Sequence, residues 1–161
     1  FRSDLKKNYP TTGHSAEFIE FIKKELQPYI ESVYKTNSTK YLMGQSLGGL
    51  LATEILLKNP ELFTHYFITS PSLWWDDESL LKDASGLLNE SHSKVEFVYF
   101  AVGSKEEKLM IKETKEISEI LKKSKSKPKN LTYKEIPETH ATILHQSIME
   151  AFKILFIERY P

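Results

Sequence analysis

A short apolar run passes into a glycine-rich turn in the segment Tyr41-Leu42-Met43-Gly44-Gln45-Ser46-Leu47-Gly48-Gly49-Leu50. Residues 41–43 have the apolar character of a buried parallel strand. Residues 47–57 have that of a buried helix, and residues 58–60, which include a proline, end it. A strand that turns sharply into a helix predicts one strand-and-helix unit of a parallel sheet.

The rest of the chain continues this alternation. Apolar runs predict three further strands, at residues 65–69, 95–102 and 131–136. Helical spacing predicts helices at 15–33, within 76–88, at 106–121 and at 143–157, and Pro28 should kink or loosen the first of them. The pattern predicts an α/β fold, with a mostly parallel sheet flanked by helices on both faces. Functional side chains should then gather at the carboxyl ends of the strands.

The composition excludes several classes of protein. The 161 residues fit one domain, and 22 basic and 22 acidic side chains leave no net charge to attract nucleic acid or an anionic membrane. The absence of cysteine excludes disulfides and thiolate-ligated metals, and no metal site or cofactor is predicted. No apolar run approaches the roughly 18 residues of a membrane span. The chain begins at Phe1 with a polar stretch, so we expect residues 1–161 to form a single domain that is incomplete at its N-terminus.

The segment Gly44-Gln45-Ser46-Leu47-Gly48 matches the pattern G-x-S-x-G. Three fixed positions match by chance in about one chain of this length in twenty, so the position between a predicted strand and a predicted helix matters more. Serine on such a turn is held in strained backbone geometry, and flanking glycines leave room for the close approach of the chain. The motif predicts Ser46 as a nucleophile and the Leu47 N–H as an oxyanion donor, with a purely structural glycine turn as the alternative.

A serine nucleophile needs a base, and the chain has five histidines. Three of them, His14, His65 and His92, occupy positions typical of solvated or capping residues. His145 lies inside the last predicted helix, where a structural hydrogen bond is expected. His140 alone follows the last strand and precedes the last helix, which suits the chain order nucleophile, acid, base, so His140 is the predicted general base.

The third group should be a carboxylate that orients the imidazole. Glu106 and Glu107 both follow the strand that precedes the predicted base. We choose Glu106, although both residues also suit the first turn of a helix, where acids favour the dipole. Asp76, Asp77 and Glu138 are weaker alternatives.

Two adjacent tryptophans, Trp74 and Trp75, follow the strand at residues 65–69. Neighbouring residues of a regular element cannot both point inward, so at least one ring should face the cleft or solvent. We expect these rings to form a hydrophobic wall that binds an acyl or aryl group of the substrate.

Four segments carry a family resemblance: residues 41–50, Thr69-Ser70-Pro71-Ser72-Leu73-Trp74-Trp75, Val102-Gly103-Ser104-Lys105-Glu106 and Thr139-His140. Together they resemble the bacterial putative-esterase family of α/β-hydrolases, which includes esterase D-like proteins and siderophore (enterochelin-type) esterases. The resemblance extends over essentially the whole chain. It implies hydrolysis of carboxylic esters through an acyl-enzyme, with Ser46 attacking, His140 moving the proton and Glu106 at the acid position. The resemblance to siderophore esterases also leaves open a catalytic pair of serine and histidine that works without the acid.

The resemblance also implies the fold and the substrate. The family's α/β-hydrolase sheet has about eight strands, of which the four predicted here match the C-terminal half. The other half would supply the second oxyanion donor. The substrate implied is a small-molecule ester, such as a siderophore lactone or an acylated sugar. The family is bacterial, and the sequence favours neither the cytoplasm nor the periplasm.

An incomplete sheet leaves the strand at Tyr41 with an unpaired apolar edge. We therefore expect a missing N-terminal segment or a partner chain to complete the sheet. Two other functions remain open from the sequence: acyl transfer to an alcohol on the same scaffold, and a binding domain that has lost catalysis.

Overall fold

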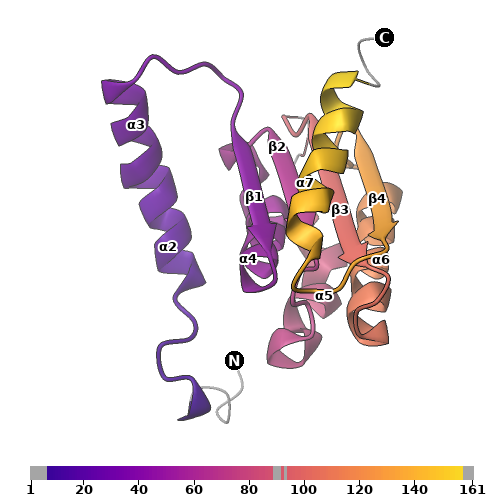
Figure 1. Cartoon of the computed structure of the whole chain (residues 1–161). Helices are drawn as coiled ribbons and strands as arrows, with labels where there is room; N and C mark the ends of the chain where they lie inside the picture. Colours follow the sequence, from indigo (N-terminus) through magenta and orange to yellow (C-terminus); the bar gives the residue numbers. More distant parts are fainter. Residues whose placement is uncertain (1–6, 89–91, 93, 158–161) are drawn as a thin grey trace.

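The structure is a computed structural model that describes residues 7–88, 92 and 94–157. In this part of the chain four parallel strands form one sheet in the order β1 (Tyr41–Gln45), β2 (His65–Thr69), β3 (Phe97–Gly103) and β4 (Leu131–Ile136). The register places Gln45 opposite Thr69 and Thr69 opposite Ala101, so the carboxyl ends lie along one edge of the sheet. The predicted parallel α/β architecture is confirmed (Figure 1).

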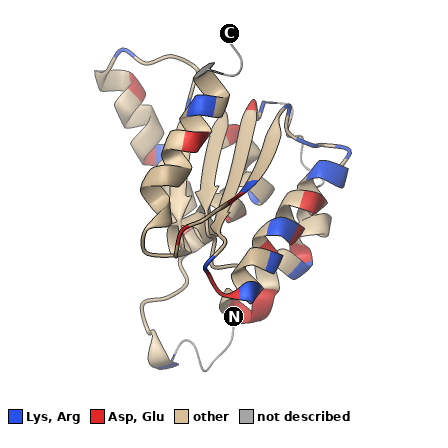
Figure 2. Ribbon diagram, turned by 45° about the vertical axis from the view of Figure 1, so that its right-hand side comes forward, with Lys and Arg blue, Asp and Glu red and all other residues tan. Residues whose placement is uncertain are grey.

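Helices cover both faces of the sheet. One face carries α4 (Leu47–Lys58), α5 (Trp75–Leu87) and α6 (Lys108–Lys123), with the short 3₁₀ turn η2 (Pro60–Leu62) after α4. The other face carries α7 (Ile143–Phe152), which continues as the π-helical turn η3 (Lys153–Ile157) (Figure 1). Charged residues lie mainly on the helices and loops, and the strands contain few of them (Figure 2).

The core is built on β3, which is buried along its whole length. Its side chains alternate between the two faces. Val98 and Phe100 belong to the cluster under α4, α5 and α6, whereas Phe97, Tyr99 and Ala101 belong to the cluster under α7. A parallel strand that is buried on both faces has a continuous apolar sequence, which is why this strand is evident from the sequence.

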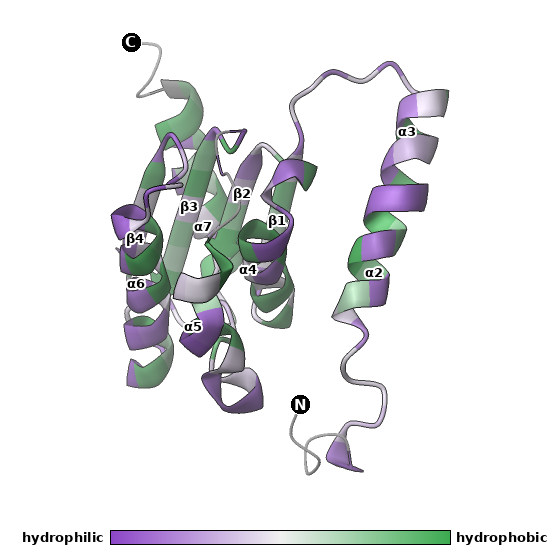
Figure 3. Cartoon of the chain, turned by 180° about the vertical axis from the view of Figure 1, so that it is seen from behind, coloured by the Kyte–Doolittle hydropathy of each residue, from purple (hydrophilic) through white to green (hydrophobic). Residues whose placement is uncertain are grey.

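The N-terminal helix is divided in three: α2 (Ser15–Phe21), a π-helical turn η1 (Ile22–Leu26) and α3 (Gln27–Val33). The loosened turn lies directly before Pro28, as its missing N–H predicts. Of the residues in this helix, only Ile19 and Ile22 are buried in the core cluster. Figure 3 shows hydrophobic residues that interrupt the hydrophilic surface of α2 and α3, and the exposed ones are Phe18, Phe21, Leu26, Tyr29, Ile30 and Val33.

Strand β1 lies at the edge of the described sheet and pairs with β2 alone among the described strands. Tyr41 and Met43 are 38% and 44% exposed on it, whereas every residue of β2 is buried. The structure thus has the apolar edge that the sequence predicts. The segment expected to cover it stays a prediction.

Some boundaries differ from the predictions. Strand β1 extends two residues further, to Gln45, and β3 begins at Phe97 rather than at Val95. Helix α5 opens with three consecutive residues at positive φ, Asp76 to Glu78, which lift its first turn out of helical geometry. No helix in the described ranges combines the length and apolar character that a membrane span needs.

Candidate active site

Ser46 occupies the turn between β1 and α4 with φ 57° and ψ −122°. This conformation is costly for a residue with a Cβ, so the surroundings must hold it. The Ser46 N–H donates to the Thr69 carbonyl at 3.1 Å, and the Ser46 carbonyl accepts from the Ser72 N–H at 3.1 Å. The end of β2 therefore fixes the turn from the side, as the motif requires.

Two of the glycines near Ser46 are held in close contact. A Cβ on Gly44 would lie 2.3 Å from the Gly48 carbonyl oxygen, and one on Gly49 would lie 3.0 Å from the Pro71 Cα. A Cβ on Gly48 would meet nothing within 4 Å. The prediction that the flanking glycines leave room is confirmed for Gly44 and wrong for Gly48, because the tight approach on that side is to Gly49.

Leu47 is the first residue of α4. The amides of a first helical turn have no intrahelical acceptor, so the Leu47 N–H is available beside the Ser46 side chain. The Leu47 side chain is half-exposed. Its role as an oxyanion donor stays a prediction.

Glu106 and His140 form a hydrogen-bonded pair. His140 Nδ1 lies 2.8 Å from Glu106 Oε2. Glu106 Oε1 accepts from the Ser70 hydroxyl at 2.6 Å and from the Gly103 N–H at 2.7 Å. An ionised carboxylate only accepts, so we place the imidazole proton on Nδ1, which leaves the Nε2 lone pair free to act as a base. The Glu106 side chain is only 1% exposed, whereas that of His140 is 42% exposed.

The alternative acids lie elsewhere. Glu107 is the exposed N-cap residue of α6. Glu138 accepts a hydrogen bond from the Thr142 hydroxyl. Asp76 accepts one from the Ser79 hydroxyl, and Asp77 forms an ion pair with Lys82. Of the five acids considered, Glu106 is the one that bonds to the His140 ring.

The other histidines are not all solvated, and that expectation was wrong for two of them. His65 is buried against the Tyr41 ring, 4.6 Å between centroids, and His92 is buried with Nε2 2.8 Å from the Leu56 carbonyl oxygen. His14 is the exposed N-cap residue of α2. His145 is exposed on α7, and no structural hydrogen bond of its ring is found within the described ranges.

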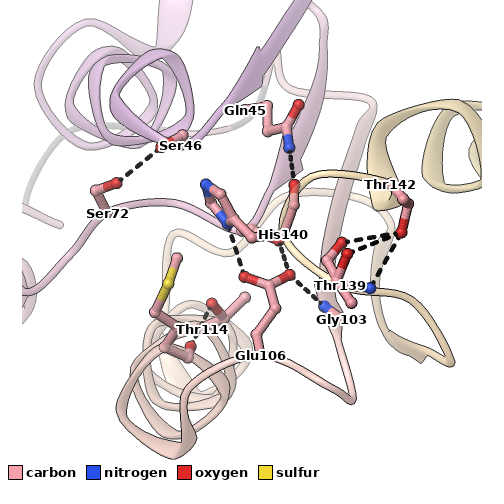
Figure 4. A network of polar contacts seen from close by, with 11 residues as sticks. Gln45, Ser46, Ser72, Gly103, Glu106, Thr114, Thr139, His140 and Thr142 are labelled. Atoms are coloured by element: carbon pink, nitrogen blue, oxygen red, sulfur yellow. Dashed lines mark hydrogen bonds and ion pairs between the residues drawn. The ribbon is translucent and has the colours of Figure 1, made fainter.

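The serine and histidine lie together at the carboxyl edge of the sheet. In Figure 4 the His140 ring lies between the Glu106 carboxylate and the hydroxyls of Ser46 and Ser72. Within the described residues the Ser46 hydroxyl contacts the Ser72 hydroxyl, at 3.2 Å, and forms no hydrogen bond with the ring. Gln45 Nε2 donates to the His140 carbonyl at 2.6 Å and so ties the histidine loop to β1.

Three polar residues of this site, Gln45, Ser70 and Ser72, were assigned no role from the sequence, although Ser70 and Ser72 were expected at this edge of the sheet. All three lie at the ends of β1 and β2, and two are in the quoted segment from Thr69 to Trp75. Their position at the carboxyl ends of the strands was the sequence feature that could have indicated a role in the site.

The two tryptophans have different surroundings. Trp75 lines a cavity of about 600 Å³ between the N-terminal segment, α4 and α5, and Leu47 lines the same cavity. The Trp74 ring is 42% exposed, lies 5.6 Å from the Trp75 ring and is not part of the cavity lining. Sequence reasoning expected at least one ring to face the cleft or solvent, and both positions agree with that.

No set of three or more His, Asp or Glu side chains within the described ranges is arranged to hold a metal ion.

Comparison with known proteins places the chain. A family model described as "Putative esterase" matches residues 3–156. The chain belongs to this esterase family. Among curated relatives of the chain, the ferri-bacillibactin esterase BesA of Bacillus subtilis (strain 168) is 35% identical over 77 residues, which make up 47% of this chain and 27% of BesA.

Solved structures give the same family fold. The BES protein from Bacillus cereus is similar with a TM-score of 0.80 and 35% identity, over 91% of this chain and 58% of that one. An IroE-like serine hydrolase from Shewanella oneidensis is similar with a TM-score of 0.78 and 27% identity, over 90% of this chain and 48% of that one. The α/β-hydrolase fold is thereby confirmed, and the chain spans only about half the length of these two structures.

Proposed function

We propose that this esterase cleaves carboxylic esters through a serine acyl-enzyme, with Ser46 as nucleophile, His140 as general base and Glu106 as the acid that orients it. The observation that carries the proposal is the 2.8 Å contact between His140 Nδ1 and the buried Glu106 carboxylate. This contact leaves His140 Nε2 as the acceptor on a ring beside a serine in strained geometry (Figure 4).

In the proposed reaction, His140 Nε2 takes the Ser46 hydroxyl proton while Ser46 Oγ attacks the ester carbonyl carbon. The negative charge then on the carbonyl oxygen is stabilised by the Leu47 N–H at the start of α4. When the tetrahedral intermediate collapses, the bond to the alcohol breaks and His140 returns the proton to the departing alcohol. Water then attacks the acyl-Ser46 ester by the same steps, which releases the carboxylic acid.

The substrate class follows from the cavity and from the relatives. Leu47 and Trp75 connect the residue beside Ser46 with a cavity of about 600 Å³, whose walls include Phe18, Leu50 and Leu80. A volume of this size suits a small molecule. Two further curated relatives, from Emericella nidulans and Aspergillus fumigatus, are named siderophore esterases, and we propose a siderophore lactone as the first substrate to test, with acylated sugars as the second.

We also propose that a further segment pairs with β1, either from the same protein or from a partner chain, and supplies the second oxyanion donor. The exposed Tyr41 and Met43 on an edge strand support this, because such edges are normally covered. Expression of residues 1–161 alone tests the proposal by sedimentation and thermal unfolding. We expect self-association or low stability, and a stable monomer would contradict the proposal.

The experiment for the function measures hydrolysis of p-nitrophenyl acetate and of a siderophore trilactone by the intact protein. Ser46→Ala should abolish both activities without lowering the unfolding temperature. Product analysis with added alcohol separates hydrolysis from acyl transfer, since transfer produces a new ester. A folded wild-type protein with no activity on either ester would favour the binding domain.

A further inference from the structure

Ser72 contacts the proposed nucleophile at two points. Its backbone N–H donates to the Ser46 carbonyl at 3.1 Å, and its hydroxyl oxygen lies 3.2 Å from Ser46 Oγ. Ser72 is 2% exposed, so water has almost no access to its hydroxyl. The contact is therefore built into the fold.

The direction of the hydroxyl contact follows from the acceptors available. Ser46 Oγ is the only hydrogen-bond partner of the Ser72 hydroxyl within the described residues. A buried hydroxyl that fails to donate loses the free energy of a hydrogen bond, so the Ser72 proton is best satisfied by Ser46 Oγ. The Ser46 proton is then directed elsewhere, and the Nε2 lone pair of the neighbouring His140 ring is an acceptor for it (Figure 4).

We infer that the Ser72 hydroxyl donates a hydrogen bond to Ser46 Oγ and stabilises the negative charge that develops on that oxygen when His140 removes its proton. This inference rests on the proposed function. The same hydrogen bond assists deacylation, in which Ser46 Oγ is the leaving group and again gains negative charge. A fixed donor directed at developing charge in a water-poor site is worth more than the same donor in water.

Residues 70–72 contact both ends of the proposed catalytic set. Ser70 donates to Glu106 Oε1 at 2.6 Å, and the Ser70 N–H donates to the Ala101 carbonyl at 2.7 Å, which anchors the segment to β3. Pro71 packs so closely on α4 that a Cβ on Gly49 would lie 3.0 Å from its Cα. Because the segment is fixed at both serines and at the proline between them, the Ser72 hydroxyl is positioned before substrate arrives.

Ser72→Ala in the intact protein tests the inference. We expect kcat for p-nitrophenyl acetate and the rate of labelling by a fluorophosphonate to fall roughly tenfold to hundredfold, since one hydrogen bond to a charged oxygen is lost. KM and the unfolding temperature should change little, because the donor acts on the developing charge and not on substrate binding. Ser72→Cys, which keeps a weak donor of similar shape, should recover part of the rate.

Ser32→Ala is the matched control, because Ser32 lies exposed on α3 and, among the described residues, its hydroxyl donates to the Tyr29 carbonyl alone. It should leave kcat, KM and labelling unchanged. Wild-type kcat and labelling in Ser72→Ala would overturn the inference, as would faster labelling, which would mean that Ser72 restrains the nucleophile. A raised KM with unchanged kcat would also overturn it. A wild-type protein that is neither active nor labelled would instead overturn the proposed function itself.

Discussion

Two glutamates with buried side chains, Glu106 just before α6 and Glu113 within it, differ in their hydrogen-bond partners. Glu106 has a side chain that is 1% exposed and accepts hydrogen bonds from Ser70, Gly103 and His140. Glu113 is fully buried, and neither of its carboxylate oxygens makes a hydrogen bond within the described residues. Burial, with a smaller effect of the Glu78 carboxyl, raises the pKa of Glu113 to about 7.

The difference shows that partners, and not burial alone, decide what a buried acid can do. The Glu106 carboxylate accepts three hydrogen bonds, and a carboxylate that accepts from an imidazole can orient the ring and stabilise its cation. Burial and the nearby Glu78 carboxyl favour the neutral form of Glu113, so ionisation of Glu113 is a cost to stability. Exchanging either group for its amide should therefore have opposite consequences.

Glu106→Gln should give the largest effect. The Gln amide donates where the carboxylate accepted, so His140 would carry its proton on Nε2 and could not act as a base. We expect kcat for p-nitrophenyl acetate to fall on the order of 10²- to 10⁴-fold. Steady-state kinetics on the intact protein measure this.

Glu107→Gln is the matched control for that variant, because Glu107 is adjacent but exposed at the start of α6. Its activity should match the wild type. If Glu107→Gln loses activity and Glu106→Gln keeps it, the assignment of the acid is wrong. Activity retained in both variants would instead support a Ser-His pair.

Ser70→Ala should give an intermediate effect. It removes one of the three donors to Glu106 and leaves the His140 contact in place. The loss of a hydrogen bond to a charged group corresponds to about 1.5–3 kcal/mol, so we expect kcat/KM to fall roughly tenfold to hundredfold. A double-mutant cycle with Glu106→Gln tests whether Ser70 acts through Glu106. Ser70→Ala should lower kcat/KM little further once the carboxylate has been replaced.

Glu113→Gln should leave activity nearly unchanged and alter how stability depends on pH. The folded-state pKa of Glu113, about 7, lies above its ordinary value of 4.5, so the folded protein holds the proton more tightly than the unfolded chain. Stability from this group is therefore complete below about pH 4.5 and is lost as pH rises toward 7.

Thermal and denaturant unfolding of both proteins between pH 5 and pH 8 measure that difference. The variant should gain about 1–3 kcal/mol in free energy of unfolding relative to the wild type across this range. A difference that stays constant with pH would show that Glu113 does not titrate there. Lys112 and Glu78 are the charged groups that also act on it, and Glu78→Gln should reduce the effect.

The sequence was sufficient to predict the candidate catalytic residues that can be recognised by their order along the chain and their positions after strands. Ser46, Glu106 and His140 follow the ends of β1, β3 and β4, and parallel topology brings such ends together. The contacts of Gln45, Ser70 and Ser72 depend on sheet register and on loop geometry, neither of which is written in a local pattern. The buried His65 was missed for the same reason, since its partner ring, Tyr41, comes from the neighbouring strand.

The fold itself was predictable because its signals are local. Buried strands such as β3 have continuous apolar sequences, and Pro28 marks the loosened turn of the first helix. The left-handed turn from Asp76 to Glu78 has no glycine to mark it, so nothing in the sequence indicated it.

The most direct test of the account is the rate at which a fluorophosphonate labels the intact protein, with the modified residue mapped by mass spectrometry. The account predicts one adduct, on Ser46, and a labelling rate that falls at least about 10²-fold in His140→Ala, which removes the base. An adduct on another residue, or equal labelling of the wild type and His140→Ala, would contradict it.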